Sequence, residues 1–262
     1  MRLYYEIALR SFRRMTAYRT AFIAGMLTNA FFGAIRCFVY IAVYDSGGTV
    51  AGFTLVDAIS YTWITQSLIS IGAGWITADM ASTIYSGAVI TDLSRPWNFY
   101  GYWLSRFLGE RVFNLLLRGT STYVLGVLFF DAYVASPIEL LSFAVAISLA
   151  MLVSFALTFL VNLTAFWLLD FTGVAMIANV VLSFFSGFLL PIAFFPPQLR
   201  TVAELLPFQA ITGLPAQVFL GQLTGVALIE TLLLQLFWAA LLIMLGVLLL
   251  RVAVRKVIIQ GG

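Results

Sequence analysis

The chain has 262 residues, of which 62% are hydrophobic and 10% charged, with a net charge of +3. A soluble domain carries about 25% charged residues, so this composition indicates an integral membrane protein. The sequence contains no histidine, one cysteine and one lysine (Lys256), which does not follow a glycine. These counts exclude a Cys/His metal cage, a Ser-His-Asp triad and a Walker A motif on this chain. We expect no catalytic residue, no metal site and no nucleic-acid partner.

Six apolar stretches are long enough to cross the hydrocarbon core as helices of about 20 residues. They are continuous and rich in Leu, Phe and Ala, whereas a barrel would need short alternating segments. The expected spans are residues 20–44, 55–78, 112–130, 140–169, 173–195 and 225–250. The fold class is therefore expected to be an all-α polytopic membrane protein with six transmembrane helices in one domain, residues 1–262.

Basic residues are distributed unevenly around these spans. Five Lys and Arg residues precede the first span, four lie around the loop between spans two and three, and three follow the last span. Six spans would place all of these on one side, while Arg36 falls inside a span and Arg200 on the other side. The positive-inside rule then predicts cytoplasmic termini for a multi-pass protein of the cell (plasma) membrane.

Residues 1–19 are predicted to form an amphipathic helix. Its basic side chains and one acid recur at helical spacing, with tyrosine, alanine, phenylalanine and methionine on another face. Such a helix lies in the headgroup plane with its arginines toward anionic lipid; the alternative is an ordinary basic flank. The residues expected to define it are Arg2, Glu6, Arg10, Arg13 and Arg14.

The longest polar stretch, residues 79–103, follows the second predicted span. Gly87 can end a short helix and Thr91 or Asp92 can cap another turn, while Pro96 keeps Arg95 extended. Four aromatic residues suited to the membrane interface come next. The stretch is either a docking element for a cytoplasmic partner or a plain amphipathic return into the bilayer.

Residues 186–224 contain five prolines, which divide an otherwise apolar run into pieces too short to span. Unpaired backbone cannot face lipid, so we expect broken, re-entrant helices packed against protein, with Gln209 satisfying freed backbone groups. The stretch is either a gate or an inert outer cap.

Arg36 lies inside the first predicted span, where insertion costs about 2.5–3.5 kcal/mol at the bilayer centre. It either faces a transport path and binds an acidic substrate group, or serves a structural role. A structural role would be snorkelling or an ion pair, for which Asp57 and Glu230 are candidate partners.

The joint order of these motifs resembles the ABC-2-type permeases of ATP-binding-cassette exporters. The pattern S-G-x(3)-P-x(3)-F-P-P-x-L-R starts at Ser186 and is followed by L-P-F-Q-A-I-x(3)-P-x(5)-G from Leu206. The cytoplasmic stretch adds G-x(4)-D-L-x-R-P from Gly87. Each motif alone is weakly specific, but their spacing is more so, and the resemblance covers nearly the whole chain.

The resemblance implies an ABC-2 (type V exporter-like) fold. Two six-helix permeases, identical or different, would work with two ABC ATPase subunits in the lipid bilayer. This chain would hold no cofactor, and ATP and Mg would bind the partner ATPase. Residues 1–19 would form an elbow helix and residues 186–224 a gate on the extracellular side. ATPase docking would involve Asp79, Ile84, Tyr85, Gly87, Asp92, Leu93, Arg95 and Pro96. The pathway and gate would involve Arg36, Phe194, Phe195, Pro196, Pro207, Phe208 and Gln209.

Two other functions compete with an exporter of hydrophobic or amphipathic substrates. An ion-coupled secondary transporter would place broken helices in both of two repeated halves, whereas the proline-broken region occurs once. A membrane-embedded lipid-modifying enzyme would need clustered acids or histidines, and the acids here are scattered.

Overall fold

The computed structural model describes residues 2–260 except for 46, 73–75 and 169. Within this part of the chain the structure is 78% helical and contains no strand. The predicted all-α class is confirmed for the described residues.

Four helical rods are long and apolar enough to cross a membrane, at Thr20–Val43, Phe99–Phe130, Pro137–Phe166 and Gly225–Lys256. They comprise α2 (Arg19–Val43), α8 (Pro137–Leu163), α12 (Gly225–Gln260) and a rod made of α6 (Phe99–Asn114), the π-helical turn η1 (Leu115–Gly119) and α7 (Thr120–Phe130). The third predicted span therefore begins at Phe99 rather than Val112. The amide of Gly101 donates to the Asn98 side chain at 2.8 Å, which caps this earlier start.

The predicted spans at 55–78 and 173–195 correspond to shorter helices, α3 (Leu55–Ser67) and α9 (Thr172–Phe185). Ten of the 13 residues of α3 are buried, so this helix lies inside the protein. Residues 68–72 follow it as turns. Four described helices thus satisfy the length criterion for a span on their own.

The core forms where α8 packs against α12 and α11 (Gly213–Phe219), and where α3 packs between α2 and α7. Trp63 of α3 is 1% exposed and rests directly on Gly126 of α7. A side chain at Gly126 would overlap the indole, so glycine is required for this close approach. The outward face of α2 exposes Leu27, Phe31 and Phe38, as expected of a surface that meets lipid.

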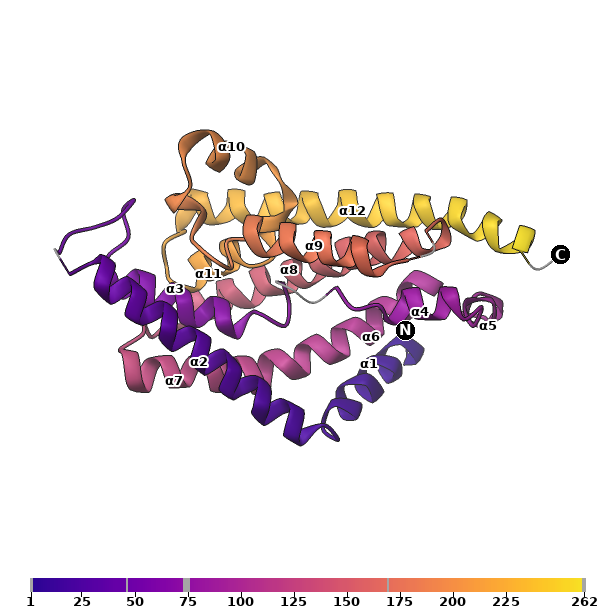
Figure 1. The fold of residues 1–262 in the computed structure, drawn as a ribbon, viewed down its shortest axis with the longest axis horizontal. Helices are drawn as coiled ribbons and strands as arrows, with labels where there is room; N and C mark the ends of the chain where they lie inside the picture. The colour runs from indigo at the N-terminus through magenta and orange to yellow at the C-terminus, as the bar shows by residue number, and fades with distance from the viewer. Residues whose placement is uncertain (1, 46, 73–75, 169, 261–262) are drawn as a thin grey trace.

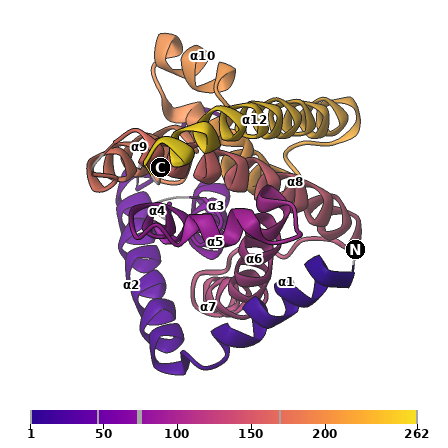
Figure 2. The same ribbon diagram turned by 90° about the vertical axis from the view of Figure 1, so that its right-hand side faces the viewer.

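Short helices gather toward the two ends of the long ones (Figure 1). Toward the end that carries the C-terminus lie α1 (Arg2–Met15), α4 (Asp79–Tyr85) and α5 (Val89–Ser94). Figure 2 shows α4 and α5 lying across this end, with α1 beside them. Toward the other end, the proline-rich region forms four short helices: η3 (Ile192–Phe194), α10 (Pro197–Leu205), η4 (Pro207–Ala210) and α11.

Candidate functional site

The pair α4 and α5 forms a bent element across one end of the molecule. Gly87 joins the two helices with φ +74°, a conformation that favours glycine, as predicted. Arg95 is extended before Pro96, also as predicted. The expected cap at Thr91 or Asp92 was wrong, because α5 already begins at Val89 and both residues lie within it.

The pair buries one face and exposes the other. Met80, Ala81 and Val89 are at most 4% exposed. Two large side chains, Tyr85 and Ile90, are 45% and 54% exposed. Partial burial, and to a lesser extent the Asp170 carboxylate, raise the pKa of Tyr85, so its hydroxyl stays protonated and can donate a hydrogen bond.

The predicted docking residues divide between these two faces. Ile84 and Leu93 pack against the core clusters and face inward. The exposed members are Asp79, Tyr85, Gly87, Arg95 and Pro96. The guanidinium of Arg95 lies 4.8 Å from the Trp97 ring, a cation–π contact at the end of α5.

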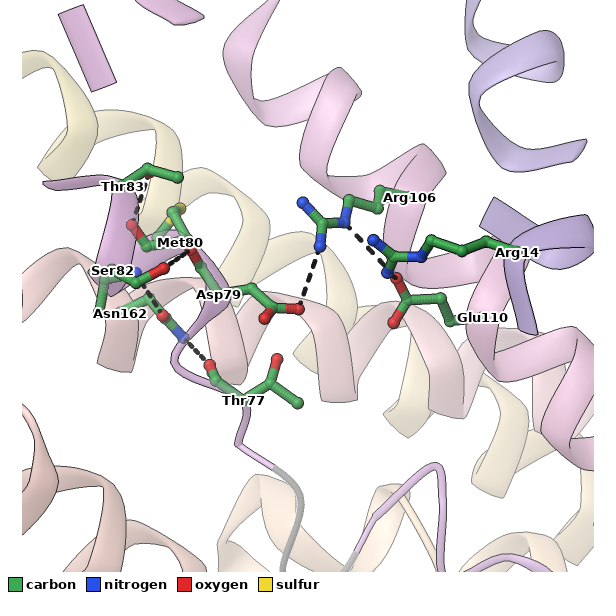
Figure 3. A network of polar contacts seen from close by, with 10 residues as sticks. Arg14, Thr77, Asp79, Met80, Ser82, Thr83, Arg106, Glu110 and Asn162 are labelled. Carbon is green, nitrogen blue, oxygen red and sulfur yellow. Dashed lines mark hydrogen bonds and ion pairs between the residues drawn. The ribbon is translucent and has the colours of Figure 1, made fainter. Parts of the chain in front are cut away.

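A buried asparagine of α8 holds the start of α4 (Figure 3). The Asn162 carbonyl oxygen accepts from the Ala81 amide at 3.0 Å, and its amide group donates to the Thr77 carbonyl at 3.0 Å. Asn162 is 2% exposed, so both bonds are shielded from water. Buried backbone groups need such partners, and Asn162 thereby fixes α4 to the long helix α8.

A chain of ion pairs joins α4 to α6 and α1 (Figure 3). Arg106 of α6 lies 3.4 Å from Asp79 and 3.5 Å from Glu110, and Arg14 of α1 lies 2.5 Å from the same Glu110 oxygen. The Arg106–Glu110 pair is partly buried, whereas the other two pairs reach solvent, and exposed pairs contribute about 0.2–1 kcal/mol each. They orient α4 relative to α1 and α6 more than they stabilise the fold.

Helix α1 packs closely on α6. Gly109 lies directly against the backbone of Ala8, and any side chain there would overlap it. The Asn98 amide donates to the Tyr4 hydroxyl at 3.0 Å. The amphipathic helix predicted within residues 1–19 is present, and α4, α6 and α1 form one connected unit.

The stretch that follows α3 leads directly into α4 and is held by polar side chains of α8 and α9. The Ser154 hydroxyl donates to the Ile71 carbonyl, and the Ile76 amide donates to the Asn179 side chain at 3.0 Å. In a continuous second span, the backbone groups of Ile71 and Ile76 would bond to other backbone groups of the same helix; here they bond to side chains of α8 and α9 instead. Gly72 lies directly against the Thr212 side chain, so this stretch contacts the proline-rich region.

The phenylalanines predicted for the gate pack against different aromatic neighbours outside the proline-rich region. Phe194 packs against Phe53 with ring centroids 5.4 Å apart, whereas Phe195 packs against Phe184 at 4.9 Å. Phe208 lies 6.2 Å from Phe185 of α9. Pro207 and Gln209 are buried, and Pro196 is exposed. The Gln209 amide donates to the Glu204 carbonyl at 3.2 Å, so it satisfies a backbone group as expected.

Arg36 reaches this region from α2. Its guanidinium donates to the Phe188 carbonyl at 2.9 Å and lies 4.5 Å from the Phe188 ring. The ion pair considered for Asp57 is absent, because that carboxylate accepts from the Thr54 amide at 2.9 Å in a capping box. Through these contacts Arg36 links α2 to the loop that follows α9.

Comparison with known proteins identifies the family. A sequence model described as ABC-2 family transporter protein matches residues 31–261. The chain belongs to this family. A search of curated proteins and a search of solved structures each gave no match.

As an ABC-2 family member, the chain is the membrane permease of an ABC transporter, and it associates with ABC ATPase subunits and with the membrane. Permeases of this family are generally non-catalytic transport subunits. The match agrees with the resemblance seen in the sequence motifs. The sequence predicts that Glu110 and Arg111, with Arg106 and Arg118, form an ion-pair cluster at the cytoplasmic interface, and the Arg106–Glu110 pair is present at i and i+4 on α6. It does not predict that this pair is joined to α4, nor that Asn162 belongs to the site, because nothing local points from Asn162 to α4.

Proposed function

We propose that this ABC-2 permease exports a hydrophobic or amphipathic substrate from the cytoplasm, driven by ATPases that dock on α4 and α5. The observation that carries the proposal is the form of this pair. It exposes Tyr85 and Ile90, while Asn162 and the Arg106 ion pairs fix its base to the long helices. A firmly held short helix can transmit a push that a loose loop would absorb.

The assembly proposed contains two permease subunits and two ATPases, with ATP and Mg bound by the ATPases. The second permease is identical or different. We propose that α3 and α9, each extended by the segments beside it, provide two further crossings besides the four long helices. The chain would then cross the plasma membrane six times and have both termini in the cytoplasm. The chain's basic residues, gathered near α1, α4 and the end of α12, support this orientation. Helix α1 would then lie as an elbow at the inner surface, and residues 186–224 would form an outer gate.

Co-purification in mild detergent tests the docking. We expect the tagged chain to retain an ATPase with a Walker A motif, identified by mass spectrometry. Replacing Tyr85 and Ile90 together with alanine should weaken this association about 30-fold or more, since buried interface tyrosines are frequent hot spots of about 2 kcal/mol. Leu205→Ala is the matched control, because Leu205 is 70% exposed on α10 toward the opposite end.

Two results would contradict the proposal. A chain that purifies alone, under conditions that preserve other membrane complexes, would argue against docked ATPases. Equal retention of the ATPase by the Tyr85/Ile90 variant and by Leu205→Ala would place the docking surface elsewhere.

A further inference from the structure

A cavity of about 290 Å³ lies beside the site, where the corner between α1 and α2 meets α6, η1 and the stretch after α3. Arg111 and Arg118 line it, together with a single acid, Glu110. Arg111 is 7% exposed. A cavity that gathers two arginines inside a membrane protein is a candidate binding site by default.

Neutral groups hold Arg118 at this cavity. It donates to the Gly25 carbonyl at 3.0 Å and to the Asn29 side chain at 2.8 Å. Among the described residues no carboxylate lies within 4.0 Å of the Arg118 guanidinium. The carboxylate of Glu110, which also lines the cavity, is paired with Arg14 and Arg106. Arg118 therefore brings a positive charge to the cavity without a carboxylate beside it.

Arg118 lies well inside the Phe99–Phe130 rod. Twelve residues separate it from Phe130, the last residue of the rod, which is roughly 18 Å at about 1.5 Å per residue. A cation at such depth normally pairs with an acid or a backbone carbonyl, and it faces the protein interior or a cavity that marks a ligand path. Arg118 has the Gly25 carbonyl as a partner, as Arg36 has that of Phe188, but Arg118 also lines a cavity.

The apolar part of the lining indicates what kind of anion would fit. Phe22 and Phe113 line the cavity beside the arginines, and the exposed residues Tyr18 and Ala21 form part of its rim. A volume of about 290 Å³ is at the low end of the range for ligand sites, about 300–1,000 Å³. This volume accommodates a ligand headgroup and the first carbons of its hydrocarbon tail, while the rest of the tail lies in the lipid leaflet.

We propose that this cavity binds the anionic headgroup, a phosphate or carboxylate, of an amphipathic molecule whose tail leaves past Tyr18 and Ala21. A resident phospholipid and a transported substrate share this chemistry. In the second case the inference names the substrate class of the exporter proposed above, and it rests on that function only in this respect.

Binding of tetradecyl phosphate to the full chain in neutral detergent, measured by native mass spectrometry, tests the site. Tetradecanol, which has the same tail without charge, is the matched ligand. We expect the phosphate to bind at least about 10-fold more tightly, because hydrogen bonds to charged groups are the stronger ones. Arg118→Gln should remove about 10-fold of this affinity, and Arg200→Gln, an exposed arginine paired with Glu204, should remove none.

A second pair of variants tests the cavity without touching its charges. Ala21→Trp fills the rim and should abolish phosphate binding. Ile23→Trp adds the same bulk two residues along, at a position that is 51% exposed and outside the cavity lining, and should bind normally. This pair decides the question if Arg118→Gln fails to fold. Equal binding of phosphate and alcohol, or normal binding by Ala21→Trp, would overturn the proposal.

The complex with its ATPase separates the two sources of the headgroup. ATP should release the bound phosphate if the site holds cargo, and should leave it in place if the site holds a resident lipid; both support the site. If no ATPase co-purifies but the phosphate binds, the exporter proposal fails and the site stands. If the ATPase docks and no phosphate binds, the site fails and the exporter proposal stands.

Discussion

The two ends of this molecule combine buried bonds and ion pairs in different proportions. At the α4–α5 end one buried side chain, Asn162, holds the start of α4, and solvent-accessible ion pairs join Asp79 to Arg106 and Glu110 to Arg14. The proline-rich region has one exposed ion pair, within α10, but buried neutral bonds tie it to other helices: the Tyr61 hydroxyl donates to the Gly187 carbonyl at 2.7 Å, and Gln235 donates to the Ala210 carbonyl at 2.8 Å. Exposed ion pairs rearrange at little cost, whereas buried bonds keep one geometry. The α4–α5 end can therefore turn about its Asn162 anchor, whereas the proline-rich region moves as a unit with the helices beside it.

The chain between Gly72 and Asp79 connects these two regions. Gly72 rests on Thr212, and only a few residues later Asp79 begins α4. A displacement of α4 therefore has a short covalent route to the proline-rich region. Asn162 bonds to both the Thr77 carbonyl and the Ala81 amide, so its replacement tests how firmly the start of α4 must be held.

The largest effect is expected for Asn162→Leu. The change leaves the Ala81 amide and the Thr77 carbonyl without their partner, which should lower the free energy of unfolding by about 2 kcal/mol or more. The free energy is measured by denaturant titration in detergent micelles. Because α4 loses its anchor to α8, co-purification of the ATPase should fall as well.

Gln235→Leu is the corresponding change for the proline-rich region, which Gln235 contacts from α12. It removes bonds to two carbonyls, those of Ala146 and Ala210, and should reduce stability while ATPase association is retained. Loss of the ATPase in both variants to the same extent would mean that association follows global stability, and the contrast between the two ends would be lost.

Gly72→Ala should have the next largest effect. A methyl group at this position would overlap the Thr212 hydroxyl and press on Ile211, and overpacking of this kind costs about 1–3 kcal/mol. Thr212→Ala should partly rescue it, since the Thr212 hydroxyl is buried and has no partner whose loss would cost stability. The coupling free energy from the double-mutant cycle measures the contact directly.

Gly173→Ala is the matched control for this prediction. Gly173 lies in the first turn of α9 with open space around it, so alanine should be tolerated and should stabilise the helix by less than the value of about 0.5–1 kcal/mol expected in a helix interior. Additive effects of Gly72→Ala and Thr212→Ala would show that the two segments do not press on each other.

Much of the fold was predictable because it depends on local features. The apolar runs predicted the four long helices, and the prolines predicted the broken region at 186–224. Gly87 predicted the turn between α4 and α5. The end of α3 at Ser67 was not predictable in this way. Its following carbonyls and amides bond to Ser154, Asn162 and Asn179, which lie on helices distant in sequence.

The candidate site was predictable only in outline. The motif around Gly87 indicated the segment, but not which of its side chains face outward. Ile84 and Leu93 face the core because α4 and α5 pack on the ends of α6 and α8, and this arrangement depends on tertiary contacts. In the same way, Arg36 could be placed inside a span from the sequence, whereas its bond to the Phe188 carbonyl depends on where the loop after α9 folds.

The smallest effect is expected for Arg106→Gln, which tests the exposed ion pairs themselves. Its loss removes the ion pairs to Asp79 and Glu110, although Glu110 keeps its pair with Arg14, and each such pair contributes about 0.2–1 kcal/mol. The change should therefore lower the free energy of unfolding by less than about 1 kcal/mol. In about 1 M salt, where the Debye length is about 3 Å, the difference from wild type should disappear.

Arg200→Gln, which breaks an i,i+4 pair with Glu204 on α10, should have a similarly small and salt-sensitive effect on stability. Arg106→Gln alone should reduce the ATPase activity of the co-purified complex, because only its partner Asp79 begins α4, the helix on which we propose that the ATPase docks. A large, salt-independent loss of stability in Arg106→Gln would mean that the α4–α5 end is held as rigidly as the proline-rich region.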